Sequence, residues 1–317
     1  MPALSGTTTK VIGFLLVLLC LAFVVQQLLT LDLRQLPAER WLELTGTVLV
    51  GGLFYGLLSL SLSFAWRHLL LWSGEAQAPA KLCHGIYGRA QLGKYLPGNI
   101  FSIAGRHFLG VKSGFSNRSL VWAATLEILG MTFVSGLLFA FGIPALGISH
   151  QLVGIPLLLV ALSVPLILPW VMKEVLQRLP ALKSFHLPTR RIGAYLRLYG
   201  VFFLYLPFFL AGTTLLWWLL YTATGGHPPP YLAVLSLSSG AWLAGYVTPG
   251  ASGGIGVRDA LLILAFKPFV GEAVVFAVIA YRLATILGDV VYFLVALLFP
   301  LEPVNMPTPT GNTSTSR

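Results

Sequence analysis

The segment KYLPGNIFSIAGRHFLG, residues 94–110, joins apolar residues to a Pro-Gly pair and an arginine. Pro97 has no backbone N–H group, and Gly98 tolerates dihedral angles that other residues avoid. An uninterrupted transmembrane helix would not place this pair in its middle, and a cytoplasmic loop would not be so apolar. We therefore expect a broken or re-entrant helix, which is tolerated at membrane depth only inside protein or beside a wet cavity.

Composition places the whole chain among multi-pass membrane proteins. Of its 317 residues, 56% are hydrophobic and 9% are charged, whereas soluble domains carry roughly 25% charged residues. We expect an all-α polytopic membrane protein with about seven or eight transmembrane helices. We expect a single membrane domain over 1–300 and a disordered tail over the polar residues 301–317. The apolar runs are 11–29, 46–66, 120–142, 152–171, 198–222, 231–248 and 273–299, and two broken segments lie near 82–112 and 249–268.

Basic residues predict the orientation in the membrane. Segment 67–118 contains seven Lys or Arg residues and segment 173–197 contains six, each against a single acidic residue. The positive-inside rule therefore places both segments in the cytoplasm. The net charge of +10 is then explained by topology and by attraction to anionic lipid headgroups. We expect no nucleic-acid partner.

The opening segment has a second copy. GKYLPGNIFSIAGR (93–106) and GYVTPGASGGIGVR (245–258) share the pattern G-x3-P-G-x7-R at an offset of 152 residues. Each copy is followed by Ile-Leu-Gly, at 128–130 and at 286–288, where the offset is 158. We expect a two-fold internal repeat with halves of about 40–145 and 195–300. Transporters are often built from such repeats, although a duplication without transport remains the alternative.

The two Pro-Gly copies also predict an anion site. A half-helix that starts after Pro-Gly presents free N–H groups and the positive end of its dipole, and arginine can hold a phosphate by two hydrogen bonds. The alternative is an interfacial helix whose arginine reaches the headgroup layer. The candidate substrate-binding residues in these segments are Gly98, Asn99, Arg106, Gly250, Gly254 and Arg258.

Four further charges lie in or beside the expected helices, namely Glu127, Asp259, Arg282 and Asp289. A charge at membrane depth is costly and normally faces a polar interior or a partner. They could form neutralising pairs, for instance Glu127 with Arg282, or line a substrate or proton site. The chain has no zinc-protease, phosphate-loop or paired-cysteine motif. We therefore expect no catalytic residue, no metal site and no cofactor.

The motifs together resemble one known family. They are GKYLPGNIFSIAGR, LEILG (126–130), TPGASGGIGVRDALL (248–262) and AYRLATILGD (280–289). With them the chain resembles the lysylphosphatidylglycerol synthase transmembrane-region family of flippase-like integral membrane proteins, over roughly residues 10–300. Two positions depart from the family pattern: Asp259 stands where Glu is frequent, and Glu127 precedes Ile128 where Glu-Arg is usual.

The resemblance implies an inner-membrane domain that translocates or presents a membrane lipid, either an anionic phospholipid or a lipid-linked sugar on polyprenyl phosphate. Residues 301–317 are too few for the soluble synthase domain, so we expect no synthase activity. It also implies a glycosyltransferase or lipid synthase as partner. A non-transporting subunit that docks such an enzyme is the first alternative, and an enzyme acting on a lipid phosphate is the second. The sequence predicts no oligomeric state.

Overall fold

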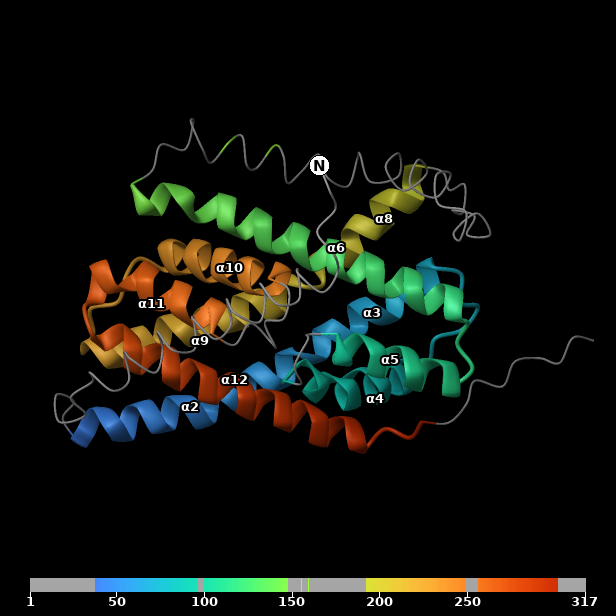
Figure 1. The fold of residues 1–317 in the computed structure, drawn as a ribbon, viewed down its shortest axis with the longest axis horizontal. Helices are drawn as coiled ribbons and strands as arrows, with labels where there is room; N and C mark the ends of the chain where they lie inside the picture. The colour runs from blue at the N-terminus through green and yellow to red at the C-terminus, as the bar shows by residue number, and fades with distance from the viewer. Residues whose placement is uncertain are drawn as a thin grey trace, which may run out of the picture.

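The computed structural model describes residues 38–95, 100–147, 155, 159, 192–248 and 256–301. Across these ranges every regular element is a helix (Figure 1). The first group of elements comprises α2 (Ala38–Leu58), α3 (Leu60–Trp72), α4 (Ala80–Gln91), η2 (Leu92–Tyr95), α5 (Phe101–Lys112), α6 (Asn117–Gly142) and η3 (Ile143–Leu146). The second comprises α8 (Ile192–Phe203), α9 (Leu206–Thr224), α10 (Tyr231–Val247), α11 (Val257–Val270) and α12 (Ala273–Leu297).

Several helical stretches have the length and composition of membrane spans. Four in the described part of the chain are long and apolar enough to cross a bilayer: Glu39–Trp72, Asn117–Leu146, Leu196–Thr224 and Ala273–Leu297. Helix α10 is apolar but shorter. These five coincide with the expected runs 46–66, 120–142, 198–222, 273–299 and 231–248. The run 11–29 and all of 152–171 except Ile155 and Leu159 lie outside the described residues, so a total of seven or eight spans stays a prediction.

Two of the expected spans are each formed by two consecutive helices. Ser59 separates α2 from α3, and its hydroxyl donates to the Tyr55 carbonyl at 2.9 Å. A serine that bonds back along its own helix in this way is a known cause of bending. A turn at Leu204 and Tyr205 likewise separates α8 from α9. Hydropathy treats each pair as one run because neither break introduces a charge, although Pro207 follows the second break in the first turn of α9.

The two segments expected to be broken are interrupted helices as far as they are described. In the first, α4 and η2 end at Tyr95 and α5 starts at Phe101, with residues 96–99 between them outside the description. In the second, α11 starts at Val257, directly after Gly256, whose φ of +83° suits a glycine. A new helix therefore follows each Pro-Gly, and Arg106 and Arg258 lie on these helices.

The helix contacts connect the two halves of the chain. Helix α4 packs on α12, and α6 packs on α10. Helix α2 packs on α9 and α12, whereas α8 packs on α3 and α6. Figure 1 shows α4 and α5 towards one end of the molecule and α10 and α11 towards the other, with α6 and α12 running between them.

Glycines set the closest of these contacts. A Cβ at Gly56 would lie 2.5 Å from the Gly288 carbonyl oxygen, and a Cβ at Gly288 would lie 2.7 Å from the Gly52 carbonyl oxygen. Gly52 and Gly56 are four residues apart on α2, the spacing by which small residues let membrane helices approach closely. Gly130 has the same role elsewhere, since its Cβ would lie 2.5 Å from the Phe202 ring.

Replacement of Gly56 by alanine should lower the thermal unfolding midpoint of the protein in detergent. The added methyl group meets backbone that cannot rotate away, and overpacking of this kind costs about 1–3 kcal/mol. Gly46→Ala is the matched control on the same helix, because nothing lies within 4 Å of its Cβ. That variant should be neutral or stabilising by up to about 1 kcal/mol, the difference in helix propensity. Equal midpoints for the two variants would contradict the close approach of α2 and α12.

Candidate functional site

Seven charged residues of the described ranges gather in the interior where the two interrupted segments meet α6 and α12. We call them the ionic cluster. Arginine and lysine supply four positive charges, and glutamate and aspartate supply three negative charges. Its members are Lys94 from η2, Arg106 from α5, Glu127 from α6, Arg258 and Asp259 from α11, and Arg282 and Asp289 from α12.

Arg106 and Glu127 form the first ion pair of the cluster. The Arg106 Nη1 atom lies 2.6 Å from each carboxylate oxygen of Glu127. The Tyr87 hydroxyl donates a further bond of 2.6 Å to Glu127 Oε1, and its ring centroid lies 4.3 Å from the Arg106 guanidinium carbon. Both charged residues are buried. Arg106 therefore already has a full counter-charge.

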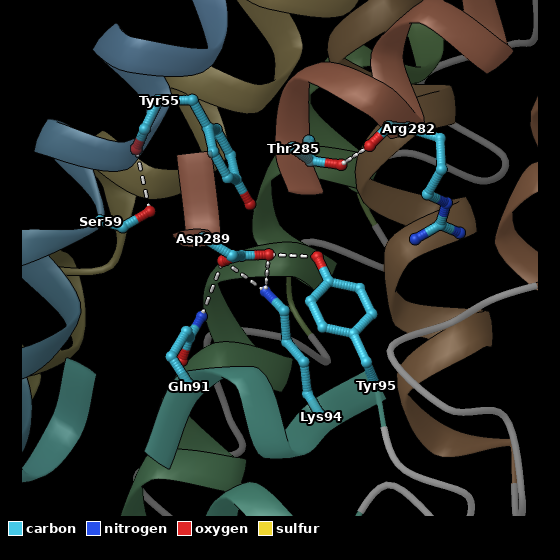
Figure 2. Close-up of polar contacts among 8 residues, drawn as sticks. All are labelled: Tyr55, Ser59, Gln91, Lys94, Tyr95, Arg282, Thr285 and Asp289. Carbon is cyan, nitrogen blue, oxygen red and sulfur yellow. Dashed lines mark hydrogen bonds and ion pairs between the residues drawn. The ribbon is translucent and has the colours of Figure 1, made fainter. Parts of the chain in front are cut away.

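Asp289 accepts the hydrogen bonds of a second group of residues in the cluster. Its side chain is completely buried and accepts hydrogen bonds from three donors, as Figure 2 shows. Lys94 Nζ lies 2.7 Å from Oδ2, and Gln91 Nε2 lies 3.3 Å from Oδ1. The Tyr95 hydroxyl donates to Oδ2. These bonds fasten α12 to the end of α4 and to η2, immediately before Pro97 and Gly98.

Asp259 and Arg282 form the third ion pair. Arg282 Nη2 lies 2.6 Å and 2.5 Å from the two carboxylate oxygens. Asp259 Oδ2 also accepts the Gly256 backbone N–H at 3.3 Å, which satisfies a free donor at the start of α11. The suggested pairing of Glu127 with Arg282 is wrong, because Glu127 pairs with Arg106 instead.

Arg258 differs from the other cations of the cluster. Its side chain is 7% exposed, and it forms neither an ion pair nor a hydrogen bond with any residue in the described ranges. The Nε atom is buried without a partner. Its guanidinium carbon lies 5.4 Å from the ring centroid of Tyr281, a cation–π contact. Arg258 is therefore a buried cation with an aromatic neighbour but without an ion-pair partner among the described residues.

A cavity of about 100 Å³ brings the two motif arginines together. Its polar lining includes Arg106, Glu127, Arg258, Lys94 and Gln91. The aromatic side of the cavity consists of Tyr55, Tyr87, Phe208, Trp242 and Tyr246. The lining residues do not include Asp259, Arg282 or Asp289. Asp289 instead binds the lining residue Lys94, and Asp259 binds Arg282.

The size and lining of this cavity suit a small anionic group. Pockets for drug-sized ligands have volumes of about 300–1,000 Å³, so this one has room for a group such as a phosphate and not for a whole lipid. A larger groove of about 640 Å³ lies between α2 and α9. That groove is mainly apolar, and Glu43 is the one charged residue among the described residues that line it. An anion would therefore bind in the smaller cavity.

The expected site residues are only partly assembled in one place. Arg106, Glu127 and Arg258 line the cavity together, whereas Asp259, Arg282 and Asp289 form the surrounding pairs. Gly98, Asn99, Gly250 and Gly254 lie outside the described residues. Among the described residues, no group of three or more His, Cys, Asp or Glu side chains is placed to hold a metal ion.

Three residues of the site were missed from the sequence, namely Tyr87, Gln91 and Lys94. Each binds a carboxylate of the cluster and lines the cavity. Gln91 follows Tyr87 by four positions and Lys94 follows Gln91 by three, the spacing that puts side chains on one face of a helix. This polar face is the signal that could have identified them.

The chain matches no protein-family model, and no curated protein matches it. The resemblance stated above therefore rests on motifs alone. The fold and the site define the class of protein only broadly. The described part is an all-helical protein with helices of membrane-spanning length and a buried ionic cluster around a small cavity.

A double-mutant cycle on Arg106 and Glu127 should reveal strong coupling between them. Removing either charge alone, by Arg106→Met or Glu127→Met, leaves the other buried without a partner, which costs about 3–5 kcal/mol. The double variant should lose less than the sum of the two single variants. The measurement is the thermal or denaturant unfolding of the purified protein in detergent.

The exposed pair Lys267–Glu272 is the matched control for this cycle. Lys267 Nζ lies 2.8 Å from Glu272 Oε1, but the two side chains are 42% and 56% exposed. Exposed pairs contribute about 0.2–1 kcal/mol. If the buried pair couples no more strongly than this control, the assignment of Glu127 as the counter-ion of Arg106 is incorrect.

Proposed function

We propose that this protein is a multi-pass inner-membrane protein that translocates or presents a lipid carrying a phosphate group. The phosphate would enter the cavity between Arg106 and Arg258, and the hydrocarbon chains would stay outside. The observation that carries the proposal is Arg258, a buried cation without a described counter-ion that faces this cavity.

Energetics favour an anionic ligand at this arginine. Burial of an unpaired ion carries an effective penalty of several kcal/mol, and a desolvated cation–π contact such as that with Tyr281 returns about 2 kcal/mol. The rest of the penalty would be relieved by a bound anion. A ligand phosphate can accept two hydrogen bonds from one guanidinium group.

The helix contacts support the two-fold repeat, with α2–α6 corresponding to α8–α12. Helices α2 and α8 occupy equivalent places. Helix α2 packs on α9 and α12, the second and last helices of the second half, and α8 packs on α3 and α6, the second and last helices of the first half. The glycines of the two Ile-Leu-Gly motifs agree with this relation, because Gly288 approaches α2 and Gly130 approaches α8. Such repeats let a transporter expose one site to two sides by rocking of the halves.

The ion pairs suggest which contact would control such movement. Arg106–Glu127 lies within the first half, and Asp259–Arg282 lies within the second. Lys94 and Asp289 come from different halves. A rearrangement of the halves would therefore break the Lys94–Asp289 pair and leave the other two intact. The basic segments 67–118 and 173–197 would face the cytoplasm.

Purified protein reconstituted into vesicles should accelerate the transfer of a fluorescent anionic phospholipid between the two leaflets. Arg258→Gln should reduce the rate at least tenfold, because it removes the cation from the cavity. Lys267→Gln is the matched control, an exposed basic residue on the same helix, and should keep the rate. Dithionite quenching of the outer-leaflet fluorophore measures the transfer.

The rival role is a non-transporting subunit that docks a lipid-modifying enzyme. Vesicles that transfer neither anionic phospholipids nor lipid-linked sugars would refute translocation. The rival would then be supported if a glycosyltransferase co-purified with the protein and lost activity when the protein was removed. Chemical turnover of the lipid by the purified protein alone would instead indicate an enzyme.

A further inference from the structure

The two motif arginines occupy equivalent positions in the repeat pattern but have different surroundings. Arg106 is neutralised by Glu127, which directly precedes Ile-Leu-Gly in α6. In α12 the residue that directly precedes Ile-Leu-Gly is Thr285. The position that supplies the counter-ion of Arg106 therefore holds a neutral residue in the half that contains Arg258.

By the sequence pattern of the repeat, Thr285 corresponds to the residue that would supply a counter-ion to Arg258. It lies one helical turn from Tyr281, whose ring contacts Arg258, and one turn from Asp289. It is 3% exposed, and its hydroxyl donates to the Arg282 carbonyl of its own helix at 3.0 Å, as Figure 2 shows. The threonine thus faces the interior but offers Arg258 no negative charge.

The remaining charges of the cluster balance one another. The pairs Arg106–Glu127, Lys94–Asp289 and Arg282–Asp259 each contribute zero net charge. The ionic cluster therefore carries a net charge of +1, and this charge is located on Arg258. All three carboxylates are already engaged by basic side chains.

We propose that Arg258 is a phosphate subsite in which the ligand supplies the counter-ion that Glu127 supplies to Arg106. The inference rests on the proposed function and narrows its substrate class. A phosphate diester with one negative charge neutralises the cluster. A zwitterionic headgroup would bring an ammonium group as well, and no carboxylate of the cluster is left to receive it. The subsite therefore selects anionic over zwitterionic phosphate headgroups.

Ligand-induced stabilisation of the full-length protein in a non-ionic detergent tests the selectivity. The probes are short-chain phosphatidylglycerol, short-chain phosphatidylcholine and inorganic phosphate. Phosphatidylglycerol should raise the thermal unfolding midpoint at concentrations at least tenfold lower than phosphatidylcholine does. A comparable effect of inorganic phosphate would identify free phosphate as a ligand of the same subsite. Equal effects of the two lipids would overturn the proposal.

The variant Thr285→Glu tests whether the phosphate subsite lies at Arg258. Its carboxylate would provide the missing counter-ion, so phosphatidylglycerol should no longer raise the midpoint. Thr285→Gln is the matched control, with the same size and no charge, and it should still respond. If both variants fail to fold, Arg258→Gln decides, since it should abolish the response. A response that persists in Thr285→Glu or Arg258→Gln would refute the subsite.

Comparison with the vesicle assay separates this inference from the proposed function. Selective stabilisation by phosphatidylglycerol without lipid transfer would refute translocation and leave the subsite standing. Transfer that continues at the normal rate in Thr285→Glu would refute the subsite and leave translocation standing.

Discussion

The cost of charge in a protein built from membrane-length apolar helices controls the interior of this structure. A buried ion is tolerated when another ion and further hydrogen bonds replace its lost hydration. Three pairs satisfy this condition: Arg106 with Glu127, Lys94 with Asp289 and Arg282 with Asp259. Each pair joins an interrupted segment to a long helix. The same pairs that neutralise the interior therefore hold the interrupted segments in place.

The interruptions are what bring these charges inside. A continuous helix would carry its arginine past the membrane core, whereas a helix that starts after Pro-Gly places Arg106 or Arg258 within the bundle. Asp259 contributes both to the local structure of α11 and to its contact with α12. It accepts the Gly256 N–H at the start of α11 and also binds Arg282 on α12. Loss of this carboxylate would therefore affect the helix terminus and the neighbouring ion pair together.

Sequence reasoning located the helices and the charged positions but not the partners. Apolar runs and Pro-Gly patterns are local signals, so they identified α6, α12 and the segments that carry the two arginines. The partner of Glu127 depends on how α5 packs against α6, which no local pattern encodes, and Arg282 was chosen in error. Lys94 was counted as a topological charge, because its contact with Asp289 joins residues 195 positions apart.

Within the proposed repeat, the difference between Glu127 and Thr285 has a physical consequence for the cavity. If both halves carried the glutamate, each motif arginine would be neutralised and the cavity would have no net attraction for an anion. If neither half carried it, two unpaired arginines would repel one another within one small cavity. One glutamate and one threonine leave Arg258 as the cation of the cluster without an ion-pair partner in the described residues, while the other six charged residues of the cluster are paired. In our proposal, this asymmetry between the two repeat-related halves is the feature that converts a structural ion-pair network into a binding site.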